Sequence, residues 1–175
     1  MKVTYAMTPE PQCCEPETNL AAAAEMLWTK DCGVLPVVED GKLVGILTDR
    51  DICIALGTRH KCADEMVVRE VATLDVHTCS AEDDVQAAME IMRRERIRRL
   101  PVVDQEGRIE GLLALNDLVL AVDRTHGAIT YEAVINTLKT ISEHVSRKPA
   151  ASAASAKGAE QTRLPYLSHG ASGTR

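Results

Sequence analysis

The sequence predicts an α/β (α+β) fold made of two tandem copies of a β-α-β-β-α unit, followed by a helix and a disordered tail. Three observations predict it. The sequence repeats itself at a distance of 65 to 66 residues, the apolar helical face of residues 20–27 recurs at 85–92, and the turns between the predicted strands recur as well. Matching turns together with matching periodicity indicate two copies of one structural unit.

The repeat consists of similar phrases at matching positions. A shift of 65 places the LPVV of residues 35–38 on the LPVV of residues 100–103. One extra residue in the second loop makes the shift 66, and GILTDRD at 45–51 then falls on GLLALND at 111–117. The glycine and the final aspartate are kept, whereas the threonine becomes alanine.

In the first copy, a short strand near residues 11–14 leads into a helix near residues 16–30, with a proline at its first position. The strands VLPVVE and KLVGILT follow. The Asp40-Gly41 pair between them predicts a two-residue hairpin. A second helix is expected near residues 49–56.

The second copy follows the same order. A strand near residues 74–79 precedes a helix near 81–96, whose start is marked by a serine and an aspartate spaced as a capping box. The strands RLPVVD and RIEGLLA are joined by a longer loop at 105–107, and a second helix is expected near 115–123.

We predict four parts: unit 1 at residues 1–65, unit 2 at 66–125, a C-terminal amphipathic helix at 126–146 and a disordered tail at 147–175. The tail is rich in Ala, Ser, Gly and Lys and has no apolar periodicity. The C-terminal helix carries one apolar stripe, formed by Tyr131, Val134, Ile135, Leu138, Ile141 and Val145. This stripe is expected either to support self-association or to cover the edge of its own domain.

The composition limits the function classes. A net charge of −6 disfavours non-specific binding to nucleic acid, which needs a basic surface. No apolar run approaches the ~18 residues that span a bilayer, the first residues lack a secretory signal, and the six cysteines follow no disulfide pattern. We therefore predict a reduced, cytoplasmic protein without a membrane or nucleic-acid partner.

The repeated turn carries the chemistry. Thr48 lies where a strand ends and a helix begins, so unpaired N–H groups and the positive end of the helix dipole favour an anion there. Asp51, three residues on, suits the hydroxyls of a ribose. The same spacing is typical of a capping box, a structural device. In the second copy Ala114 cannot cap, so the retained Asp117 is expected not to depend on the cap.

Tandem units with an LPVV strand, a GILTDRD turn and a leading MTP-like segment resemble a CBS-domain pair, also called a Bateman module. The resemblance covers about residues 3–123. It implies two clefts for adenosine-containing ligands such as AMP, ADP, ATP, S-adenosylmethionine or NAD. By matching position it implies Asp51 and Asp117 as ribose ligands and Thr48 as a phosphate ligand. The backbone at Val34 and Arg99 would meet the adenine.

The sequence departs from this family pattern at Ala114, where the second cleft lacks the phosphate-binding hydroxyl. We therefore expect the first cleft to be the better site. The basic run RRERIRR is interpreted either as a solvated helix end or as a source of phosphate contacts from Arg98 or Arg99, with Arg50 as a further contributor.

No nucleophile, acid–base pair or phosphate loop is recognisable in the sequence, so we predict no enzymatic activity and no obligatory cofactor. A zinc site is disfavoured because the His-x-Cys spacings match no common site. The expected function is a homodimeric sensor of an adenosine-containing ligand that signals to an unknown effector protein. The alternatives are a ligand-independent interaction or stress-response scaffold, and a redox sensor using Cys13-Cys14 or Cys62.

Overall fold

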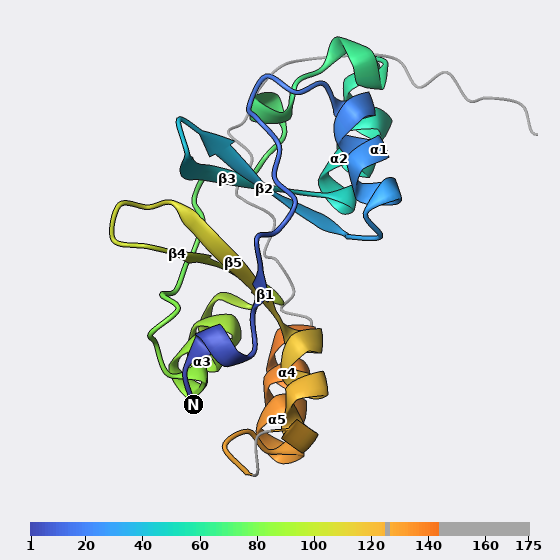
Figure 1. The fold of residues 1–175 in the computed structure, drawn as a ribbon. Helices are drawn as coiled ribbons and strands as arrows, with labels where there is room; N and C mark the ends of the chain where they lie inside the picture. The colour runs from blue at the N-terminus through green and yellow to red at the C-terminus, as the bar shows by residue number, and fades with distance from the viewer. Residues whose placement is uncertain (125–126, 144–175) are drawn as a thin grey trace, which may run out of the picture. The chain divides into compact units, whose positions relative to one another are not determined.

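The computed structural model describes residues 1–124 and 127–143; the predicted tail lies outside them. Four elements form each copy of the repeat (Figure 1). The first copy consists of α1 (Leu20–Thr29), β2 (Val34–Glu39), β3 (Lys42–Thr48) and α2 (Asp49–Arg59). The second copy consists of α3 (Val85–Glu95), β4 (Arg99–Val103), β5 (Ile109–Ala114) and α4 (Leu115–Ala121). One strand and one α-helix of the described residues lie outside the copies, β1 (Thr8–Pro9) and α5 (Tyr131–Ser142). The described residues also form four short 3-10 helices, at Val3–Tyr5, Ala63–Glu65, Val68–Glu70 and Val122–Arg124.

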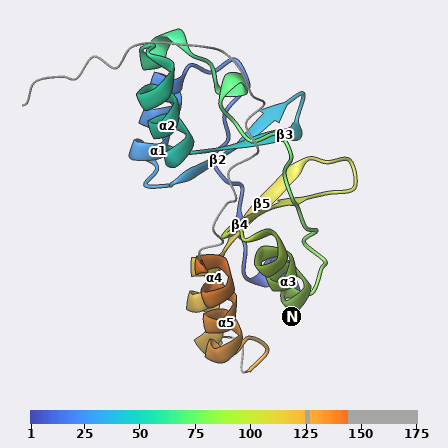
Figure 2. The same ribbon diagram turned by 180° about the vertical axis from the view of Figure 1, so that it is seen from behind.

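The two sheets are separate. β2 and β3 form an antiparallel pair, and β1, β5 and β4 form a three-stranded sheet in that order. In both ribbon views, α1 and α2 lie beside the first sheet, whereas α3, α4 and α5 lie beside the second (Figures 1 and 2). The predicted mixed helix-and-sheet repeat is confirmed.

The hairpins form as their turn residues predict. Asp40 and Gly41 have φ angles of 52° and 79°, and two positive φ angles are what a two-residue hairpin of right-handed twist requires. The longer second loop has its positive φ of 81° at Gly107. The turn residues set the register beside the loops. A bulge in each hairpin then shifts the register by one residue, so that Val34 pairs with Thr48 and Arg99 with Ala114.

The leading strands and the helix starts differ from the predictions. Each expected leading strand, near 11–14 and near 74–79, is reduced to one parallel bridge, Cys14 to Val37 and Cys79 to Val102. The first helix of each copy begins four residues later than expected. Asn19 and Asp84 take the N-cap positions, since their carboxamide and carboxylate oxygens accept backbone N–H groups at 2.8 Å.

Each apolar core includes a residue that precedes the other copy in sequence. Val3, near the start of the chain, is buried with Met89, Leu100 and other side chains of the second copy. Met66, which follows the first copy, is buried with Leu20 and its neighbours in the first core. The segments before the two copies are thus exchanged between the cores, while the division of the chain at residues 65 and 66 stays a prediction.

The repeated glycine of the GILTDRD and GLLALND phrases is explained by close approach of these exchanged segments. A Cβ on Gly111 would lie 2.5 Å from Met7 Sδ and 3.1 Å from the Thr8 carbonyl oxygen of β1. A Cβ on Gly45 would lie 3.2 Å from the Thr73 carbonyl oxygen, at the matching bridge. Glycine is therefore needed at both positions because a neighbouring segment of the chain passes too close for a Cβ, and not because a ligand binds there.

The predicted single stripe of the C-terminal helix is divided between two faces. Val134 is buried and Ile141 packs partly against the second core, whereas Tyr131, Ile135 and Leu138 are exposed. Val145 lies outside the described residues. Within those residues, no helix has the length and apolar character needed to cross a bilayer.

Candidate functional site

A cavity of about 250 Å³ lies between the two copies, and we call it the interface cavity. Its walls come from the first copy, from the segment that joins the copies and from the second copy. They are formed by Val34, Ile46, Thr48, Asp51, Thr73, Asp75, Val76, His77, Ile97, Arg98, Arg99 and Pro101. The cavity thus combines a strand-to-helix turn of one copy with arginines of the other.

Strand alternation explains why the residues of the first copy face this cavity. Leu35 and Leu47 are fully buried in the first core. Their neighbours Val34 and Thr48 pair across the hairpin and therefore lie on the opposite face, where the cavity is. Most of the predicted ligand residues meet here, namely Val34, Thr48, Asp51, Arg98 and Arg99. Arg50 does not line the cavity and is exposed on α2.

Thr48 and Asp51 form a complete capping box at the start of α2. Asp51 Oδ2 accepts hydrogen bonds from the Thr48 backbone N–H at 2.9 Å and from its hydroxyl at 2.6 Å. The Asp51 N–H donates in return to Thr48 Oγ1 at 3.2 Å. Within the described part of the chain, Asp51 Oδ1 accepts no hydrogen bond. Asp51 can therefore cap α2 and bind a ligand at the same time, because the cap uses Oδ2 and leaves Oδ1 for the ligand.

The expectation that Asp117 does not depend on the cap is wrong. Its Oδ2 accepts the Ala114 backbone N–H at 2.8 Å, so the main-chain half of the capping box survives without the threonine. Capping alone explains why this aspartate recurs in the second copy.

Asp117 lies in different surroundings from Asp51. It lines a hollow of about 570 Å³ whose other walls are six of the first nine residues of the chain, Leu120 and Ala121 of α4, and Arg124. Burial raises the pKa of the Asp117 carboxyl, although the hydrogen bond from Ala114 and the charge of Arg99 act in the opposite direction. The two predicted ribose ligands thus line different cavities, and their role in binding stays a prediction.

Arg99 distinguishes the second cleft further. It takes the position that Val34 takes in the first copy, and its Nη2 lies 3.1 Å from where a Cβ on Gly33 would be. The Arg99 side chain therefore extends from β4 to the first copy. It occupies the region in which the repeat places the second cleft. A valine leaves that space open in the first cleft.

Thr73, Asp75, Val76 and His77 line the cavity and were not among the ligand residues predicted from the sequence. These residues precede the second copy as residues 8–12 precede the first. This correspondence is the feature of the sequence from which they could have been selected. His77 Nε2 lies 3.3 Å from Glu95 Oε2, and Arg94 also pairs with this carboxylate at 2.6 Å. The Arg94 hydrogen bond lowers the pKa of Glu95, with the His77 charge acting in the same direction. Glu95 thereby helps to fix the histidine at the cavity wall.

The cysteines and the histidines offer little support for redox or metal chemistry. Burial raises the pKa of Cys14 to about 11 and that of Cys79 to about 12, and it also raises the pKa of Cys13. Such thiols are protonated near neutral pH and react slowly. No group of three or more His, Cys, Asp or Glu side chains suited to a metal ion is found in the part of the chain that the structure describes.

Comparison with known proteins identifies the same two copies. A family model of the CBS domain matches the chain twice, at residues 3–58 and 68–124. The CBS domain-containing protein YhcV of Bacillus subtilis is 36% identical over 119 residues, which cover 67% of this chain and 83% of that protein. The inosine-5'-monophosphate dehydrogenase of Thermoplasma acidophilum is 36% identical over 105 residues, 59% of this chain, but the match spans 20% of the enzyme.

Solved structures give the same relationship. The CBS domain pair of protein MJ0100, in complex with 5'-methylthioadenosine and S-adenosyl-L-methionine, has a TM-score of 0.61 and 29% identity, covering 69% of this chain and 98% of that one. CBSX2 in complex with AMP has a TM-score of 0.63 and 27% identity, covering 71% and 98%. Both are adenosine-ligand complexes.

Proposed function

Because the chain belongs to the CBS-domain family and carries two CBS domains, we propose that it is a non-catalytic regulatory module that binds an adenosine-containing ligand in the interface cavity. The ligand class is AMP, ADP or ATP, with S-adenosylmethionine as a further possibility. The observation that carries the proposal is the meeting of Thr48 and Asp51 with Arg98 and Arg99 at one cavity.

Each part of the ligand has a matching group. Asp51 Oδ1 is free to accept ribose hydroxyls, while Oδ2 stays with the cap. The start of α2 attracts phosphate through its dipole, and Arg98 of the second copy adds a positive charge to the residues that line the cavity. Val34 and Ile46 supply an apolar wall for a purine. The adenosine ligands held by related CBS pairs support this assignment.

The proposal is tested by thermal unfolding with AMP, ADP, ATP, S-adenosylmethionine and NAD, each well above its dissociation constant. A ligand at 100 times its dissociation constant adds about 2.7 kcal/mol to the free energy of unfolding. For a chain of this length the midpoint should rise by on the order of 5 to 10 °C. If none of the five compounds raises the midpoint, the alternative function, a ligand-independent interaction or stress-response scaffold, is the better account.

Signalling requires that the ligand bind one arrangement of the two copies better than another. Because the cavity has walls from both copies, closing around a nucleotide would bias their packing, and an effector protein would read that change. We place this sensor in the cytoplasm, without a membrane or nucleic-acid partner, on the acidic composition and the sequence features above.

We also propose that the chain forms a homodimer through α4 and α5. Leu120 on α4 is exposed, as are Tyr131, Ile135 and Leu138 on α5, which packs against α4. Replacing Leu120 by lysine should convert a dimer to a monomer in sedimentation velocity, since a buried unpaired charge opposes association. Ile54→Lys, at the matching exposed position on α2, should leave the dimer intact. A monomeric parent chain at about 100 μM would contradict the proposal.

A further inference from the structure

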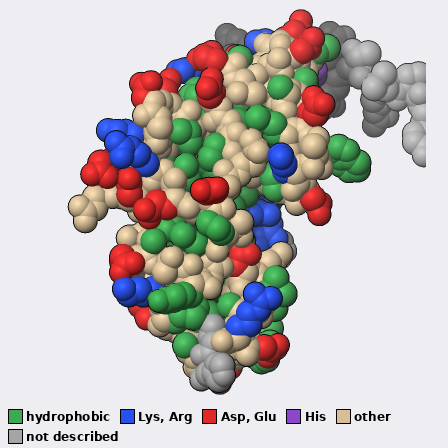
Figure 3. Space-filling model, in the orientation of Figure 1, with side chains coloured by type: hydrophobic (Ala, Val, Ile, Leu, Met, Phe, Trp, Pro, Cys, Tyr) green, Lys and Arg blue, Asp and Glu red, His purple; other side chains and the backbone are tan. Residues whose placement is uncertain are grey.

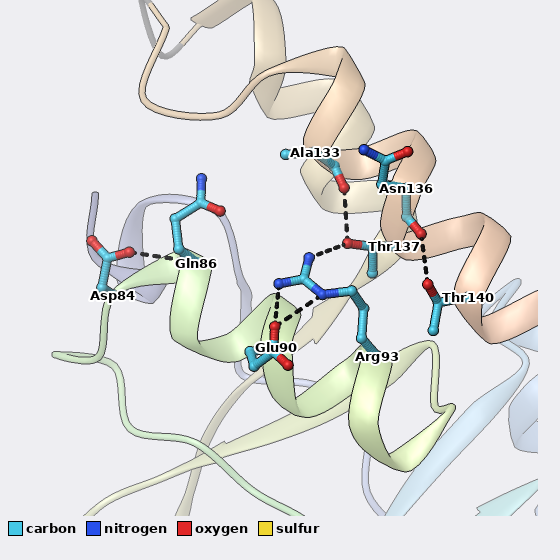
Figure 4. A network of polar contacts seen from close by, with 8 residues as sticks. All are labelled: Asp84, Gln86, Glu90, Arg93, Ala133, Asn136, Thr137 and Thr140. Carbon is cyan, nitrogen blue, oxygen red and sulfur yellow. Dashed lines mark hydrogen bonds and ion pairs between the residues drawn. The ribbon is translucent and has the colours of Figure 1, made fainter.

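In the second copy, an amphipathic helix fills the groove between the two helices. The helix is α5, and it packs on both α3 and α4. Val134 and Thr137 of α5 are 2% and 0% exposed. Arg93 Nη1 donates to Thr137 Oγ1 at 2.8 Å, while Glu90 holds the other side of the guanidinium (Figure 4). The second copy therefore shows how a helix docks in the groove between the two helices of a copy.

The matching groove of the first copy is open. It lies between α1 and α2 and has a volume of about 400 Å³. Leu27 and Ile52 form its apolar floor, at the positions of Met92 and Leu118 in the second copy. Trp28, at the position of Arg93, is 88% exposed. We call the groove between α1 and α2 the helix groove. Apolar side chains are exposed on the part of the molecule where these two helices lie (Figure 3).

The rim of the helix groove is acidic where that of the second copy is not. Asp31 and Asp49 line it, at the positions of Arg96 and Leu115. Both aspartates are exposed, and neither forms an ion pair among residues 1–124 and 127–143. The nearby cation on the inner side is Arg99, whose Nη2 and Asp49 Oδ2 lie 3.1 and 3.4 Å from the same Cβ position on Gly33, and Asp31 and the outer side of Asp49 face solvent. A ligand of this groove should therefore carry cations beside its apolar face. A second copy of the chain is disfavoured, because a twofold contact centred here brings like-charged rims together.

We propose that the helix groove is a docking site for a basic amphipathic helix of a partner protein. The helix lays its apolar face on Leu27, Trp28 and Ile52, as α5 does on the second copy, and places lysine or arginine against Asp31 and Asp49. An exposed tryptophan beside a groove is the residue type that most often dominates such contacts. Docking at this site does not depend on a ligand in the interface cavity.

The test uses the full chain and two synthetic helical peptides without tryptophan, one built from Leu and Lys and the other from Leu and Glu. Since Trp28 is the sole tryptophan of the sequence, its fluorescence reports directly on docking. The basic peptide should shift the emission to shorter wavelength and bind with micromolar affinity, and the acidic peptide should do neither. Equal binding of both peptides, or of neither, would overturn the proposal.

Variants distinguish the groove from general attraction between opposite charges. Binding, followed by anisotropy of a labelled peptide, should weaken at least tenfold in Trp28→Ala and remain in Tyr5→Ala, a matched loss of another exposed aromatic side chain. Asp31→Asn with Asp49→Asn should weaken binding several-fold and flatten its salt dependence, whereas Asp64→Asn should not. Equal effects of the groove and control variants would refute the site.

Two other occupants are separated by further measurements. If Trp28→Ala dissolves a dimer, the groove is occupied by a second copy. If a chain ending at residue 143 binds the basic peptide and the full chain does not, the groove is occupied by the chain's own C-terminal residues. Either result would overturn the partner-helix proposal while leaving the nucleotide proposal untouched.

Discussion

Replacing Asp51 by alanine is expected to raise the dissociation constant of the AMP-class ligand by at least about 30-fold. The variant removes Oδ1, the oxygen to which no described residue donates a hydrogen bond, from a residue that lines the interface cavity. Hydrogen bonds to a charged acceptor contribute about 1.5–3 kcal/mol each, and a ribose offers two hydroxyls. Isothermal titration calorimetry with the best ligand of the thermal panel measures the change.

The same variant also removes a cap, so a matched control is needed. Asp117→Ala removes the equivalent bond to a backbone N–H in the second copy and should cost a similar amount of stability, about 1 kcal/mol. Its affinity should stay near that of the parent chain, since Asp117 does not line the interface cavity. Loss of binding in Asp117→Ala alone would show that the wrong cleft was chosen.

Thr48→Ala separates the hydroxyl from the carboxylate. It gives the first copy the Ala114 arrangement, in which the aspartate keeps the backbone N–H and loses the hydroxyl. A phosphate-bearing ligand should then bind several-fold more weakly, whereas adenosine should be affected little. An equal loss for both ligands would mean that Thr48 acts only through the cap.

Replacing Gly111 by valine should reduce the free energy of unfolding by about 3 kcal/mol, at the upper end of the cost of overpacking a filled site. Even the first carbon of the new side chain would lie 2.5 Å from Met7 Sδ and 3.1 Å from the Thr8 carbonyl oxygen. β1 must then leave β5, and Val3 loses its place in the second core. Urea unfolding followed by circular dichroism measures the loss.

Two glycine controls bracket this result. Gly57→Ala, in α2, meets nothing within 4 Å and should be neutral or slightly stabilising, because alanine restricts the unfolded chain. Gly45→Val should cost less than Gly111→Val, since its nearest contact is 3.2 Å away. A Gly111→Val chain as stable as Gly57→Ala would contradict the close passage of β1.

The sequence was sufficient for those parts of the fold that are set by local chemistry. Asp40-Gly41 determines its hairpin, and apolar periodicity locates the helices of both copies. The helix starts were predicted too early because the proline at 16 and the serine at 80 precede the residues that cap the helices, Asn19 and Asp84. Boundaries depend on small differences between alternative caps, which a pattern does not rank.

The non-local features could not be predicted in this way. Nothing in the order of residues says that Val3 packs with the second copy or Met66 with the first. The same limit applies at the candidate site. The repeat correctly aligned Asp117 with Asp51, but alignment does not reveal that Arg99 extends to Gly33 or that Asp117 faces the N-terminal segment. Equivalence in sequence therefore did not imply equivalence in surroundings.

The exchange of segments between the two cores has a consequence for how the gene can be divided. If the chain were divided between the copies, the first half would expose Val3 and lack Met66, and the second half would expose Met66 and lack Val3. Neither half would then have a complete core. The pair of copies, rather than either copy alone, is therefore the smallest unit expected to fold and to be transferred intact into another protein.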